Sequence, residues 1–67
     1  MNIDAKIIAA YKRTIEADHN DAEFGTVATR RAVTRAANTL SRKINECYPN
    51  IDMAGKIKLR TQLQELA

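Results

Sequence analysis

Only three residues of this 67-residue chain belong to the two types that most strongly interrupt a helix: Gly25, Pro49 and Gly55. The long stretches between them are rich in good helix formers, and none shows the apolar–polar alternation of a β-strand. We therefore predict an all-α fold in a single domain spanning residues 1–67, with breaks between helices near Gly25 and Pro49.

The first predicted helix spans residues 3–18. Asn2 is placed to cap its N-terminus, and an aspartate in the first turn suits the helix dipole. Its broad apolar face consists of Ile7, Ile8, Tyr11 and Ile15. Residues 19–25 are predicted to be a connector in which Gly25 adopts the left-handed conformation, and Phe24 is expected to point inward and close one end of the core.

Residues 27–47 form the second and longest predicted helix, with Thr26 as its N-cap. Its apolar positions follow intervals of four, three, four and three residues, as in the a/d pattern of packed helices, and they are Val33, Ala37, Leu40, Ile44 and Cys47. Alanines at positions 28, 32 and 36 flank this seam and would let another helix approach closely.

The third predicted helix spans residues 52–65 and follows a break at Tyr48-Pro49-Asn50. Asp52 is its expected N-cap, and its apolar stripe consists of Leu59, Leu63 and Leu66. Gly55 near its start serves either close packing or a later helix start. Because the first connector is short, the first two helices should form an antiparallel hairpin, with the third packed across it or against a second subunit.

The core that these helices can build is small, because 11 of the hydrophobic residues are alanines. Full burial of one large apolar side chain stabilises a fold by roughly 1.5–3 kcal/mol, whereas ordering the chain costs about 1.5 kcal/mol per residue. Cys47 is the only cysteine, so an intrachain disulfide cannot compensate. We therefore expect a homodimeric helical bundle. Its core and subunit contacts would use Val33, Ala37, Leu40, Ile44, Leu59, Leu63 and Leu66.

Catalytic and metal-binding motifs are missing from the sequence. The acidic segment that begins at Asp18 departs from a calcium-binding loop at its fifth, sixth and twelfth positions. One histidine and one cysteine, His19 and Cys47, are too few for a structural zinc site. His19 also lacks a recognisable nucleophile partner. We therefore expect no enzymatic activity, no metal and no cofactor.

The same sequence gives a prediction of cellular location. The N-terminus lacks a basic start, and Asp4 interrupts the first apolar stretch, so we expect no signal peptide. No window approaches the ~18 uncharged apolar residues that a membrane span needs. With a single cysteine, a reducing cytoplasmic setting is the expected location and the membrane is not an expected partner.

Charge is distributed unevenly along the chain. Residues 1–25 carry five acidic and three basic residues, whereas residues 26–67 carry three acidic and eight basic residues, and no acid lies between Val27 and Asn45. Helical spacing places Arg31, Arg35, Asn38 and Arg42 on one stripe. Such a stripe can contact the phosphates of a nucleic acid. Two other interpretations stay open: the solvent-facing side of any amphipathic helix is polar, and the arginines can form ion pairs with the acidic N-terminal part of the chain.

Two functional hypotheses follow from these features. The first is a small helical regulator or inhibitor that binds a larger protein, in analogy to the general class of phage and plasmid accessory proteins. Its candidate contact residues are Arg30, Arg31, Arg35, Arg42 and Tyr48, because arginine and tyrosine are favoured interface anchors. The alternative is a nucleic-acid-binding protein that uses the basic face of the second helix, although no family motif accompanies that face.

Overall fold

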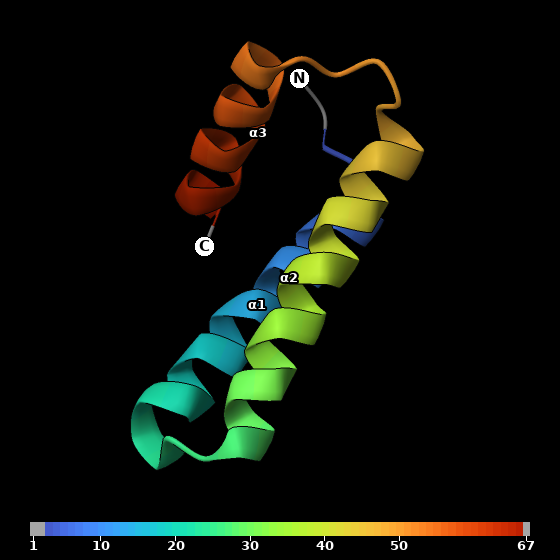
Figure 1. The fold of residues 1–67 in the computed structure, drawn as a ribbon. Coiled ribbons are helices and arrows are strands. Elements are labelled where there is room, and N and C mark those ends of the chain that lie inside the picture. The colour runs from blue at the N-terminus through green and yellow to red at the C-terminus, as the bar shows by residue number, and fades with distance from the viewer. Residues whose placement is uncertain (1–2, 67) are drawn as a thin grey trace.

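The computed structural model describes residues 3–66 and contains three helices: α1 (Ala5–Phe24), α2 (Val27–Cys47) and α3 (Met53–Leu66). Helices α1 and α2 run antiparallel as a hairpin, and α3 lies beside the half of the hairpin that holds the start of α1 and the end of α2 (Figure 1). The predicted all-α class and the helical hairpin are therefore confirmed. The hairpin end with the α1–α2 turn extends beyond α3 (Figure 1).

Helix α1 differs most from its prediction. It begins after Asp4, whose carboxylate accepts a hydrogen bond from the Lys6 amide at 2.8 Å, and the predicted cap Asn2 lies outside the described residues. The helix continues through Phe24, so the predicted connector over residues 19–25 is wrong. That segment contains no residue that stops a helix before Gly25, which adopts the left-handed conformation as expected (φ 58°).

The α1–α2 turn therefore consists of Gly25 and Thr26 alone. Thr26 caps α2 through a reciprocal pair of bonds: the Thr29 amide donates to Thr26 Oγ1 at 3.1 Å, and the Thr26 amide donates to Thr29 Oγ1 at 2.9 Å. The Thr29 hydroxyl lies 2.9 Å from Asp21 Oδ1 and links the two helices. Phe24 was predicted to point inward and close this end of the core. It is 62% exposed, so its predicted burial is wrong.

Replacement of Thr26 by alanine is expected to destabilise the protein by about 1 kcal/mol, because the first turn of α2 would lose its side-chain acceptor. Urea unfolding followed by circular dichroism measures this change. Thr61→Ala serves as the control, since Thr61 is exposed within α3 and its hydroxyl donates to the Ile57 carbonyl of its own helix. Equal stabilities of the two variants would contradict the assigned role of Thr26.

The core lies where the three helices meet. Ile7 of α1, Ile44 of α2, and Leu59 and Leu63 of α3 are buried together there. Half-buried side chains complete the cluster: Ile3, Ile8, Tyr11, Leu40, Cys47, Tyr48 and Ile51. Outside this cluster, the buried residues of α1 are the small Ala10 and Ala17. The single cluster therefore holds α3 on the hairpin.

Gly55 allows close packing and does not mark a late start of the third helix, which were the two alternatives that the sequence left open. Helix α3 begins two residues earlier, and the Gly55 amide donates to the capping carboxylate of Asp52 at 2.8 Å. A Cβ atom at position 55 would lie 2.8 Å from Cγ1 of Ile51, closer than ordinary van der Waals contact. A side chain here would push Ile51 from its place against the core.

Candidate nucleic-acid interface

The packing of α2 determines which of its faces remains open. The side toward α1 and the core carries its buried and half-buried apolar residues, spaced at intervals of three and four: Val33, Ala36, Leu40, Ile44 and Cys47. The opposite side carries Arg31, Arg35, Asn38 and Arg42, all exposed, and we call these four residues the outer stripe. Helical geometry thus turns the outer stripe away from the hairpin partner.

The charges of α2 are not neutralised by the acidic residues of α1. Within residues 3–66 the only ion pair closer than 4.0 Å joins Lys43 to Glu46 at 3.7 Å, and both belong to α2. The intrachain pairing that the sequence allowed for the arginines is therefore not formed. The arginines of the outer stripe are directed to solvent with their charge available to a ligand.

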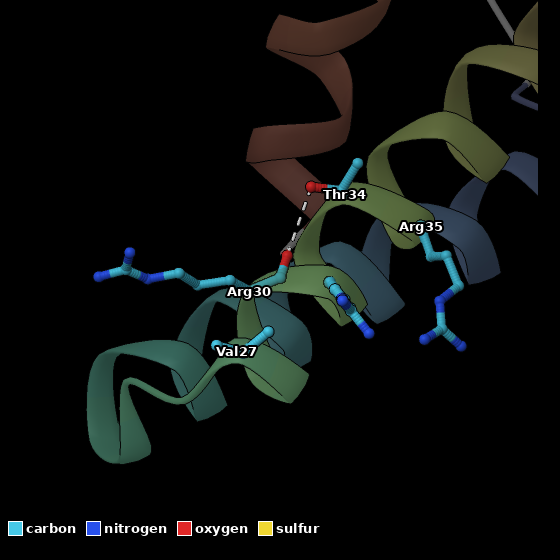
Figure 2. Close-up of a pocket in the computed structure, with 5 residues that line it drawn as sticks. Val27, Arg30, Thr34 and Arg35 are labelled. Atoms are coloured by element: carbon cyan, nitrogen blue, oxygen red, sulfur yellow. Dashed lines mark hydrogen bonds between the residues drawn. The ribbon is translucent and has the colours of Figure 1, made fainter.

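A shallow hollow lies at the start of this surface and is lined by Val27, Arg30, Arg31, Thr34 and Arg35 (Figure 2). Arg30 and Arg35 extend away from each other on the two sides of α2 (Figure 2). Thr34 is turned back onto its own helix, because its hydroxyl donates to the Arg30 carbonyl at 3.3 Å. Because Arg30 and Arg35 point in different directions, they can contact two neighbouring anionic groups of an extended ligand such as a chain of phosphates.

Helix α3 places two further cations beside the C-terminal part of α2. Lys56 and Arg60 line a second hollow together with Ser41, Ile44 and Asn45 of α2. The sequence alone does not indicate Lys56 and Arg60 as candidate contacts, because their place beside α2 depends on how α3 packs in the tertiary fold. The only sequence signal for them was the excess of basic over acidic residues in positions 26–67. We call the outer stripe together with Lys56 and Arg60 the basic face.

The remaining residues predicted as contacts occupy different environments. Tyr48 is half-buried and packs against the core cluster, so it lies on the core side of the chain and not among the arginines. Of the predicted seam, Ile44, Leu59 and Leu63 are buried and Val33 and Leu40 are half-buried. Ala37 and Leu66 are exposed in the single chain, Leu66 at 59%.

The histidine of the chain lies in the second half of α1. His19 is exposed and lines a surface hollow with Ile15, Glu16 and Asn20. In the part of the chain that the structure describes, no three histidine, cysteine, aspartate or glutamate side chains come together as metal ligands.

None of the three helices between residues 3 and 66 combines the length and the apolar character needed to cross a bilayer.

Comparison with known proteins adds no further assignment, since no protein-family model, curated protein or solved structure matches the chain.

Proposed function

We propose that this protein binds nucleic acid through the basic face. The observation that carries the proposal is the set of exposed arginines on α2, which have no acidic partner within residues 3–66 and no acidic neighbour in sequence from Val27 to Asn45. Nucleic acids present closely spaced phosphates, and neutralising them releases counterions, which favours binding to such a surface.

The polar composition of the face suits the same ligand. Asn38, Ser41 and Asn45 lie among the cations and offer uncharged hydrogen-bonding groups. Side chains of these types make many of the contacts to phosphate and sugar that position a protein on a nucleic acid. We place this function in the cytoplasm, where a lone cysteine such as Cys47 stays reduced.

A salt titration tests the proposal. The five cations of the basic face would neutralise up to five phosphates, which corresponds to a slope of about −4.5 in log K against log salt concentration for duplex DNA. Fluorescence anisotropy with labelled duplex DNA, duplex RNA and single strands should therefore show binding that weakens several-hundred-fold between about 50 and 200 mM salt. No binding at the lower concentration, or binding independent of salt, would reject the proposal.

A protein-binding regulator or inhibitor is the second candidate, and a different observation favours it. The hairpin exposes three large apolar side chains, Ile15 in the middle of α1 and Phe24 and Val27 beside the α1–α2 turn. A larger protein could bury them, with Arg30 and Arg31 at the rim of the contact. Such a contact would depend little on salt, so the titration above separates it from phosphate binding.

We further propose that the protein is a homodimer that buries the outer side of α3. Met53 and Ile57, one turn apart on α3, are 71% and 60% exposed. Among residues 3–66, the fully buried large side chains of the chain's own core are Ile7, Leu59 and Leu63. A second copy would complete this small core. The outer stripes of the two copies repel each other, so α2 would remain outside the dimer contact.

Ile57→Asp is expected to convert this dimer to monomer, because a charge would be placed in the apolar contact between subunits. Sedimentation equilibrium at micromolar concentration measures the mass. Ala9→Asp, at an exposed position of α1, is the control and should leave the dimer intact. A wild-type protein that sediments as a monomer under these conditions contradicts the homodimer.

A further inference from the structure

The outer stripe has a shape that selects among nucleic acids. Arg31, Arg35, Asn38 and Arg42 follow one another at intervals of four, three and four residues, so they lie nearly in line along α2. From the first to the last the helix advances roughly 16 Å, at about 1.5 Å per residue. That length matches about five base pairs, at 3.4 Å per base pair.

Aromatic side chains are absent from the basic face. The chain has three aromatic residues, of which Tyr11 and Tyr48 pack against the core and Phe24 ends α1 at the turn. Proteins that bind single strands stack the bases on aromatic side chains, whereas a duplex keeps its bases stacked internally. The composition of the face therefore favours a duplex over a single strand.

Small side chains border the outer stripe on both sides. Ala28 and Ala32 lie along one edge, and Thr34 and Ser41 lie along the other. Helix α2 is consequently slender at these four positions. The major groove of B-form DNA is about 12 Å wide and admits such a helix, whereas the major groove of A-form RNA is deep and too narrow for side chains to read.

The chemistry of the stripe fits base edges in that groove. Asparagine can form two hydrogen bonds with adenine, and arginine can form two with guanine. Asn38 lies at the middle of the stripe between Arg35 and Arg42. On the neighbouring helix, Lys56 and Arg60 line a hollow with Ser41 and Asn45, and Ser41 borders the outer stripe, so a phosphate strand at the groove edge could reach them.

From these observations we infer that α2 inserts its outer stripe into the major groove of duplex DNA, where Asn38 and the adjacent arginines contact base edges. Lys56 and Arg60 then contact a phosphate backbone. This inference rests on the proposed nucleic-acid binding and specifies its ligand as B-form duplex DNA read in part by sequence.

Selection from a pool of DNA duplexes with a randomised central segment tests the inference. The full-length protein should enrich a short motif, and it should bind that duplex at least tenfold more tightly than the duplex RNA or the single strands of the same sequence. Asn38→Ala should weaken binding to the enriched duplex roughly tenfold and relax the preference at one base pair. Asn20→Ala, at an exposed position of α1, is the matched control and should change neither.

The outcomes separate this inference from the proposed function. Salt-dependent binding without an enriched motif, or equal affinity for duplex RNA, overturns groove reading and leaves general phosphate binding in place. An enriched motif that Asn38→Ala leaves unchanged also overturns the assignment of base contact to this stripe. A protein that binds none of the nucleic acids at low salt overturns both proposals.

Discussion

The double variant Arg31→Glu/Arg35→Glu should lose affinity for duplex DNA by roughly 100-fold or more at low salt. Each arginine is positioned to make a charge-assisted contact, and two such contacts contribute about 3 kcal/mol or more together. The glutamates would add repulsion from the phosphates. Anisotropy titration gives the affinity, and circular dichroism should show unchanged helix content because both arginines are exposed and form no ion pair within residues 3–66.

A matched control separates local contact from total charge. Lys12→Glu/Arg13→Glu changes the net charge by the same amount at exposed positions of α1. Because these residues lie off the basic face, the control should lose only the long-range part of the attraction, which salt screens. If the two double variants lose affinity equally, binding depends on the total charge of the protein and not on direct contacts of α2.

Leu59→Ala should be among the most damaging single substitutions for stability. The Leu59 side chain is fully buried, and replacing such a leucine by alanine costs about 2–5 kcal/mol through lost burial and the cavity that remains. Domains of this size are stable by only about 3–10 kcal/mol in total. One cluster holds α3 on the hairpin, so we expect this helix to detach before the hairpin unfolds.

Urea unfolding and amide hydrogen exchange measure the two parts of this prediction. The unfolding midpoint should fall sharply, and the amides of α3 should lose protection first, because an isolated helix of 14 residues is marginal in water. Leu66→Ala is the control: this side chain is 59% exposed and its loss should change stability by about 0.5 kcal/mol or less. Similar effects of the two substitutions would show that the core lies elsewhere.

Helix bounds could be predicted where the sequence contains a local signal. The range of α2 agrees with its prediction because Thr26 caps its start and Pro49 follows its end, and both effects act within a few residues. The end of α1 was predicted too early, because the polar segment after Asp18 resembles a loop in composition. Continuous helical hydrogen bonding overrides that composition up to Gly25.

Burial was harder to predict than helix position, because it depends on where α3 lies. Ile15 belongs to the same apolar stripe as Ile8 and Tyr11, yet it is exposed and does not belong to the core cluster that holds the other two. Leu66 continues the stripe of Leu59 and Leu63 but is also left exposed. Helical periodicity predicts on which side of its helix a side chain lies. It does not predict whether another helix packs against that side, and burial depends on this.

The candidate site was partly visible in the sequence. The intervals between Arg31, Arg35, Asn38 and Arg42 already placed them on one side of a helix. The sequence could not determine whether the acidic residues of the first helix would neutralise them, which depends on the rotation of α1 about its axis. Nor could it bring Lys56 and Arg60 of α3 beside Ser41 and Asn45, which requires the tertiary fold.

Amide chemical-shift mapping tests the central claim most directly. In a titration of the isotope-labelled protein with a short DNA duplex at low salt, the largest shifts should occur at Arg31, Arg35, Asn38 and Arg42 of α2, followed by those of Lys56 and Arg60. The amides of the α1 residues around Lys12 and Arg13 should remain nearly unchanged. Shifts centred on α1 or on the apolar hairpin end, or no shifts at saturating duplex, would contradict the assignment of the basic face as the binding surface.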